Sequence, residues 1–171
     1  MIHIICGNGR GKTTSAVGLL LRAAGAGMNT AIFQFLKNGT SSEIKMLENI
    51  DSVTVRYCPE CRTFTSKMTE DEKSAVIARH NTMLSDVKAL INSRAVRLIV
   101  LDELFAAYNI NFLDRALAEE IVSTCPADVE LVLTGRDPAP FFCGLADYHS
   151  EILAVRHPYD KGVAARKGIE F

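Results

Sequence analysis

Short apolar runs alternate along the chain with longer stretches in which apolar residues recur at helical spacing. The apolar runs are typical of buried strands, which we predict at residues 2–6, 30–36, 53–57, 96–101, 129–134 and 152–155. The amphipathic stretches predict helices at residues 14–26, 42–48, 69–93, 112–125 and 138–146. Strands that alternate with helices predict an α/β fold, in which helices cover both faces of a mostly parallel central sheet.

Local signals support the boundaries of two helices. Gly25 and Gly27 fit the C-terminal end of the first helix, and Thr69 with Glu72 resembles a capping box that opens the longest one. Residues 58–67 show no periodicity and are predicted to form a loop. Because no repeat, low-complexity tract or linker interrupts the pattern, we expect residues 1–171 to form a single domain.

A glycine-rich turn between the first strand and the first helix carries the strongest chemical signal. In this position, glycines let backbone N–H groups surround a phosphate, and the helix N-terminus adds partial positive charge. Lys12 is expected to neutralise phosphate oxygens, and Thr13 to offer its hydroxyl to Mg²⁺. The alternative is a strand–helix turn that binds no ligand. The residues of this candidate phosphate loop are Gly7, Asn8, Gly9, Arg10, Gly11, Lys12, Thr13 and Thr14.

The loop is one residue shorter than the usual phosphate-loop motif. That motif places four residues between its first glycine and the Gly-Lys pair, whereas three residues separate Gly7 from Gly11 here. The first glycine of a full-length motif would stand where this chain has Cys6. A shorter loop is expected to hold a phosphate chain differently from an ordinary kinase, which opens chemistry at an atom other than the γ-phosphorus.

Charged residues follow two of the other predicted strands. Asp102 and Glu103 come directly after the run at 96–101, where carboxylates beside a phosphate loop are placed to bind Mg²⁺ directly or through water. A simple helix N-cap is the alternative for this pair. Arg136 follows the run at 129–134 and is a candidate contact for phosphate, because ligands bind at this edge of an α/β sheet. A solvated surface arginine is the alternative there.

Together with the C-terminal tail, these motifs resemble the phosphate-loop type of ATP:corrinoid adenosyltransferase over nearly the whole chain. The motifs are the short loop, Leu-Asp-Glu-Leu at 101–104, Thr-Gly-Arg at 134–136, and the tail from Arg156 that ends Gly-Ile-Glu-Phe. The resemblance implies a phosphate-loop NTPase-like fold. It further implies that the cobalt(I) of a reduced corrinoid attacks the 5′ carbon of ATP, that triphosphate leaves, and that the enzyme is a homodimer.

The resemblance also implies roles for individual residues. Residues 7–13 would hold the triphosphate, and Glu103 with Thr13 would bind Mg²⁺. Because cobalt(I) is itself a powerful nucleophile, no activating base is needed, and the sequence shows no Ser-His-Asp or Cys-His signature. The protein would align the attack, while Lys12, the loop N–H groups and Mg²⁺ stabilise the charge that develops on triphosphate.

Enzymes of this family cover the lower face of the corrinoid with aromatic residues, two of them from a Phe-Thr-Trp segment. This removes the lower axial ligand of cobalt(II) and makes its reduction feasible. Here Phe64 fits the segment, but Ser66 stands in place of tryptophan, and the chain contains no tryptophan. Candidate substitutes, for which ordinary packing is the alternative, are Phe105, Tyr108 and Phe112.

Cys58 and Cys61 lie two residues apart in the same predicted loop. A zinc site usually needs further ligands, and His80, Cys125 and Cys143 are too scattered in sequence to predict a second pair. Two free thiols are therefore expected. Lys37 is a candidate phosphate contact or a solvated lysine. His157 is a candidate ligand contact or a residue that fixes the tail.

The composition of the chain limits the kinds of partner and the cellular location that we expect. The 19 basic and 20 acidic residues give a net charge of −1, so no surface field favours nucleic acid or an anionic membrane. The apolar runs are too short for a membrane span, and the first is too short for a signal peptide. With five cysteines, an odd number that predicts reduced thiols, a cytoplasmic location is expected.

Two other functions are compatible with parts of the pattern. A nucleoside kinase of the thymidine-kinase type also combines a phosphate loop, an Asp-Glu strand end and cysteine pairs. It would need a full-length loop and a second cysteine pair, which this chain lacks. A non-catalytic module that binds ATP and a corrinoid is the other alternative. For an adenosyltransferase, a reductant such as a flavoprotein would reduce the cobalt(II) of the corrinoid to cobalt(I).

Overall fold

The structure, a computed structural model, describes residues 1–169 apart from the side chain of residue 160. Its centre is a six-stranded sheet with strand order β3-β2-β4-β5-β1-β6, in which every neighbouring pair is parallel. The last two residues of the tail motif, at positions 170 and 171, lie outside the described residues. The strands are β1 (Ile2–Cys6), β2 (Thr30–Gln34), β3 (Val53–Tyr57), β4 (Leu98–Asp102), β5 (Glu130–Thr134) and β6 (Tyr148–Glu151).

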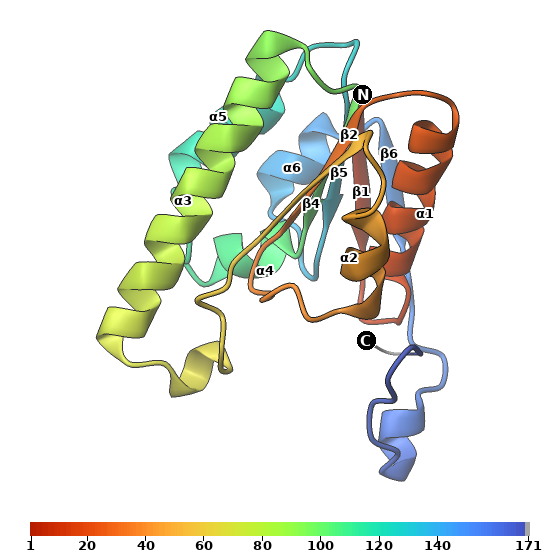
Figure 1. Ribbon diagram of the computed structural model, residues 1–171. Coiled ribbons are helices and arrows are strands. Elements are labelled where there is room, and N and C mark those ends of the chain that lie inside the picture. The colour runs from red at the N-terminus through yellow and green to blue at the C-terminus, as the bar shows by residue number, and fades with distance from the viewer. Residues whose placement is uncertain (170–171) are drawn as a thin grey trace.

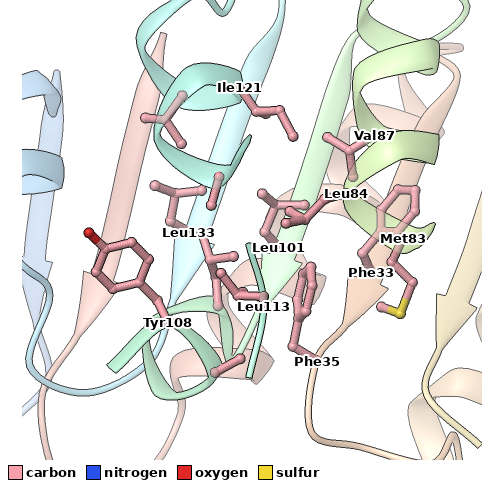
Figure 2. Close-up of a cluster of buried hydrophobic side chains, with 14 of the residues drawn as sticks. Phe33, Phe35, Met83, Leu84, Val87, Leu101, Tyr108, Leu113, Ile121 and Leu133 are labelled. Carbon is pink, nitrogen blue, oxygen red and sulfur yellow. The ribbon is translucent and has the colours of Figure 1, made fainter. Parts of the chain in front are cut away.

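Helices cover both faces of the sheet, as predicted (Figure 1). The helices are α1 (Lys12–Gly25), α2 (Ser42–Leu47), α3 (Glu70–Ser93), α4 (Leu104–Asn109), α5 (Arg115–Ser123) and α6 (Pro140–Leu145), with short 3-10 turns at Thr65–Lys67 and Pro158–Lys161. One apolar layer joins α1 and α2 to the sheet. A larger layer joins α3, α4, α5 and α6 to the opposite face, and Figure 2 shows its side chains interlocking. None of the helices in residues 1–169 combines the length and apolarity that a membrane span requires.

The central strands follow the apolar pattern because both of their faces are covered. All five residues of β2 and of β4 are buried, so each strand is apolar almost throughout. Apart from Thr30 at the start of β2, the polar residues lie at the carboxyl ends, where Gln34 closes β2 and Asp102 closes β4. These polar ends meet at one edge of the sheet, next to the turn that follows β1.

The last predicted strand differs from the observed one. The last strand is Tyr148–Glu151 rather than 152–155, and all four of its residues are exposed. As an edge strand it pairs only with β1, so it has no apolar run to reveal it. Residues 152–155 instead continue past the strand, where the Ile152 carbonyl accepts a hydrogen bond from the Gly9 N–H at 2.7 Å.

The predicted helix at 112–125 begins later, and a further short helix precedes it. Asp114 caps α5 by accepting a hydrogen bond from the Leu117 N–H at 3.0 Å. The unpredicted helix α4 starts directly after Glu103, whose backbone has a left-handed φ of 58°. By contrast, the capping box of Thr69 and Glu72 at the start of α3 is confirmed.

Candidate active site

The phosphate loop needs its glycines because the segment after β6 packs against it. Gly7 has a φ of 103°, and a Cβ atom there would lie 2.4 Å from the Ile152 carbonyl oxygen. A Cβ atom on Gly9 would lie 2.7 Å from the Leu153 carbonyl carbon. The Gly9 N–H is already engaged by Ile152, so this residue serves close packing. Gly11 has a φ of 116° and stands at the N-cap of α1.

Lys12 lies inside the loop. It is 8% exposed, and its Nζ donates a hydrogen bond to the Gly9 carbonyl at 2.9 Å. Burial lowers the pKa of the Lys12 ammonium below its ordinary value, while the Glu103 carboxylate opposes that shift. A cation is therefore held at the centre of the curled backbone, where it can neutralise an anion.

Asp102 is the hub of the site. Its carboxylate is fully buried and accepts hydrogen bonds from the Thr13 hydroxyl at 2.9 Å and the Thr134 hydroxyl at 2.7 Å. It also accepts from the Gln34 amide at 3.1 Å and from the Lys37 ammonium at 2.7 Å. Four donors from four segments therefore fix this charge and offset the cost of burying it.

Glu103 follows Asp102 in the chain and is the N-cap residue of α4. Its backbone N–H donates a hydrogen bond to the Thr134 hydroxyl at 3.0 Å, so that hydroxyl links the two acidic residues. Burial raises the pKa of the Glu103 carboxyl above its ordinary value, and the neighbouring Asp102 raises it further. Lys37 leads the nearby positive charges that act in the opposite direction.

The residues around Asp102 fit a divalent cation. Thr13, Asp102 and Glu103 supply only oxygen ligands, which are those that Mg²⁺ prefers. The Lys37 ammonium contacts Thr13 Oγ1 at 3.0 Å and Asp102 Oδ2 at 2.7 Å. A positive charge thus stands in contact with two of the oxygens that a metal ion would use.

A large cavity of about 1060 Å³ opens beside the phosphate loop. That volume reaches the upper range of small-molecule sites. Phe64, at its edge, has a side chain that is 80% exposed. The cavity wall is formed by Arg10, Thr13, Thr14 and Val17, by residues 36–38 and 40–43, by Cys61, Arg62, Thr63, Phe64 and Lys67, and by Gly168 and Ile169 of the tail.

Arg136 lies apart from Phe64. It is exposed and lines a second cavity of about 300 Å³, together with Gly7, Asn8 and Glu151. The structure therefore places the predicted site residues in three groups. Arg10, Thr13, Thr14 and Phe64 line the large cavity; Gly7, Asn8 and Arg136 line the small one; and Gly9, Gly11, Lys12, Asp102 and Glu103 line neither.

The candidate substitutes for the missing tryptophan belong to the core. Phe105, Tyr108 and Phe112 are at most 8% exposed and pack in the layer under α3 to α6. Ser66 lies in the exposed 3-10 turn Thr65–Lys67. In the described part of the chain, Phe64 is therefore the aromatic residue at the wall of the large cavity.

Sequence reasoning missed several polar partners. Gln34 and Thr134 were not assigned roles, although each is a polar residue at the end of a buried strand, which is the signal that could have found them. His80 is too far from Cys58 and Cys61 in sequence to predict a shared site, yet α3 brings its ring to the two thiols. His157 caps the 3-10 turn Pro158–Lys161 by accepting a hydrogen bond from the Tyr159 N–H at 3.2 Å, and this local contact does not distinguish its two predicted roles.

Comparisons with known proteins identify the family of this chain. The family model for ATP:corrinoid adenosyltransferase BtuR/CobO/CobP matches residues 1–171. A corrinoid adenosyltransferase of Pseudomonas aeruginosa is 33% identical over 167 residues, which are 96% of this chain and 80% of that protein. The corrinoid adenosyltransferase CobA of Salmonella typhimurium is 30% identical over 174 residues, with 100% of this chain and 85% of that protein covered.

A solved structure supports the fold alone. A KaiC-like protein from Pyrococcus horikoshii superposes with a TM-score of 0.56 at 12% identity, covering 89% of this chain and 70% of that one. The nucleoside kinase and the non-catalytic module are not favoured by these matches. Since the family model covers the whole chain and the site carries the short phosphate loop and its acidic hub, the protein belongs to the ATP:corrinoid adenosyltransferase family.

Proposed function

We propose that residues 1–171 act as one domain that transfers the 5′-deoxyadenosyl group of ATP to the cobalt(I) of a corrinoid and releases triphosphate. The observation that carries the proposal is the short phosphate loop beside the acidic hub, in a chain whose family membership is established over its full length. The cobalt ion belongs to the substrate.

The phosphate loop would bind the triphosphate of ATP. Its backbone curls around Lys12, and α1 begins at that residue, so an ammonium and a helix N-terminus act on the same anion. Negative charge grows on the triphosphate as the bond to the 5′ carbon breaks. Groups that are already fixed in place stabilise this charge at little cost of reorganisation, which is how the loop accelerates the reaction.

Thr13, Asp102 and Glu103 would hold Mg²⁺. When bound, the ion would neutralise part of the charge of the triphosphate. Lys37 contacts two of the same oxygens, so its ammonium would move toward phosphate when the metal binds. Arg136, in the adjoining small cavity, would add positive charge at the far side of the loop.

The large cavity would receive the corrinoid, with Phe64 against its lower face. Phe64 is mostly exposed, so an apolar ring is available there for a large planar ligand. Phe64→Ala should lower turnover much more when cobalt(II) is the starting state than when preformed cobalt(I) is supplied. Equal losses in the two assays would contradict this role.

The resemblance supports three further parts of the proposal. These are a homodimer, a cytoplasmic location and a separate reductant, such as a flavoprotein, that reduces cobalt(II) to cobalt(I). Light scattering on the purified protein tests the first of them, because a monomer at working concentration would exclude it.

The phosphate product tests the reaction class. The full-length protein is incubated without oxygen with ATP, Mg²⁺ and chemically reduced cob(I)alamin, and phosphorus NMR follows the nucleotide. Triphosphate as the product supports transfer from the 5′ carbon. ADP would indicate a kinase and would overturn the proposal.

A further inference from the structure

Two thiols and an imidazole meet beside the large cavity. The Sγ atoms of Cys58 and Cys61 and a ring nitrogen of His80 all lie within 4.8 Å of one another, and the three residues are buried. The cysteines flank a tight turn after β3, in which the Cys61 N–H donates to the Cys58 carbonyl at 3.0 Å. His80 reaches them from α3. Residues from two distant segments thus present three soft or borderline ligand atoms to one point.

The hydrogen bonds of His80 suit a metal ligand. Nδ1 lies 2.8 Å from the Phe112 carbonyl, which can only accept, so Nδ1 carries the proton. The lone pair therefore lies on Nε2, where it accepts a hydrogen bond from the Leu36 N–H at 3.1 Å that a metal ion would displace. Metal-binding histidines commonly donate their other N–H to a backbone carbonyl, which fixes the ring and its tautomer.

A carboxylate stands beside the two thiols. The Cys58 thiol donates a hydrogen bond to a carboxylate oxygen of Glu60 at 3.5 Å. A Cys-x-x-Cys turn with a distant histidine is a familiar set of zinc ligands, and a carboxylate or water completes many such sites.

We propose that Cys58, Cys61 and His80 bind one Zn²⁺ ion, with Glu60 or water as the fourth ligand. Binding would release the two thiol protons to solvent and form two zinc–thiolate bonds. Ligand atoms of a tetrahedral zinc site lie roughly 3.5 Å apart, so small side-chain rotations suffice. The Leu36 N–H would exchange its bond to Nε2 for one to a thiolate sulfur.

A bound zinc ion would stabilise the wall of the large cavity. Cys61 lines that cavity and precedes Phe64 by three residues. The Cys58 N–H donates to the Lys37 carbonyl at 2.9 Å, which ties the same turn to the segment after β2. Zinc would therefore join this segment, the loop and α3, and would restrict the motion of Phe64. This inference goes beyond the proposed transfer reaction and does not require it.

Metal content tests the proposal directly. The full-length protein, purified with a thiol reductant and without chelator, should hold about one equivalent of zinc per chain. After zinc removal, added Co²⁺ should produce the thiolate charge-transfer and tetrahedral ligand-field absorption bands. Cys61→Ser should abolish both signals. Cys125→Ser, which removes a cysteine outside the cluster, should leave them unchanged.

A second readout does not depend on the cysteine variants. Because the chain lacks tryptophan, Ser66→Trp places a single tryptophan two residues after Phe64 in the loop. Zinc added to the metal-free protein should raise its fluorescence anisotropy. A reduced wild-type protein that binds no zinc or Co²⁺ would overturn the proposal, as would binding that survives Cys61→Ser. The proposal would also be overturned if Cys58 and Cys61 formed a disulfide and the protein still bound no zinc after that disulfide was reduced.

Discussion

The Thr134 hydroxyl offers the sharpest test of the acidic hub. It donates to Asp102 at 2.7 Å and accepts from the Glu103 N–H at 3.0 Å, and the residue is fully buried. Thr134→Val keeps the shape of the side chain but removes both hydrogen bonds. Thr134→Ser keeps the hydroxyl and loses only a methyl group, so the two variants separate hydrogen bonding from packing.

The expected magnitudes follow from these contacts. A hydrogen bond to a charged group contributes about 1.5 to 3 kcal/mol, and a buried N–H without an acceptor costs about 1 to 3 kcal/mol. We therefore expect Thr134→Val to lower the free energy of unfolding by about 2.5 to 6 kcal/mol, the sum of the two contributions. Thr134→Ser should lower it by about 1 kcal/mol, the contribution of one buried methyl group.

Urea unfolding at equilibrium measures the difference between the two variants. Both should retain the denaturant slope of the wild type, since neither changes the surface that unfolding exposes. A valine variant as stable as the serine variant would refute the reasoning, because the hydroxyl would then contribute nothing beyond its volume.

Two further predictions concern the charges of the site. Lys12→Ala should reduce turnover by about 100-fold to 1000-fold, because a fixed donor to the developing charge is lost. The matched control is Lys45→Ala, which removes an exposed lysine on α2. Near-normal turnover of Lys12→Ala would show that the phosphate-loop assignment is wrong. Glu103→Gln should gain stability relative to the wild type as pH rises. The folded state raises the pKa of Glu103, so the wild type loses its contribution as pH climbs from the ordinary value of about 4.3 through the folded pKa, whereas glutamine does not titrate. Unfolding at several pH values in EDTA, without nucleotide, measures this gain, and a difference that stays flat or falls with pH would contradict it.

The sheet could be predicted from sequence where its strands are covered on both faces. The runs at β1, β2, β4 and β5 are apolar because these strands lie inside the sheet with helices over both faces. The edge strand β3 could be predicted because Val53 and Val55 alternate with polar residues and pack against the apolar layer under α1 and α2. At the edge, Tyr148–Glu151 pairs on one side only, and its polar residues gave no apolar run to find. The helix at Leu104–Asn109 was missed because four of its six residues are buried, which leaves no polar face to show an amphipathic period.

In the candidate site, contiguous motifs could be predicted from the sequence, whereas contacts between distant segments could not. The phosphate loop and the Asp102–Glu103 pair could be predicted because each is a contiguous motif. The partners of Asp102 could not, since Gln34 and Thr134 are brought to it only by the strand order of the folded sheet. His80 joins Cys58 through the way α3 packs, which sequence spacing does not encode.

The central claim is that this chain forms a cobalt–carbon bond from ATP. The most direct measurement follows the corrinoid absorption spectrum without oxygen, with ATP, Mg²⁺ and chemically reduced cob(I)alamin, and quantifies triphosphate in the same samples. We expect adenosylcobalamin and triphosphate in equal amounts over several turnovers. ATP binding with no cobalt–carbon bond would contradict it and would leave a protein that holds both substrates without joining them.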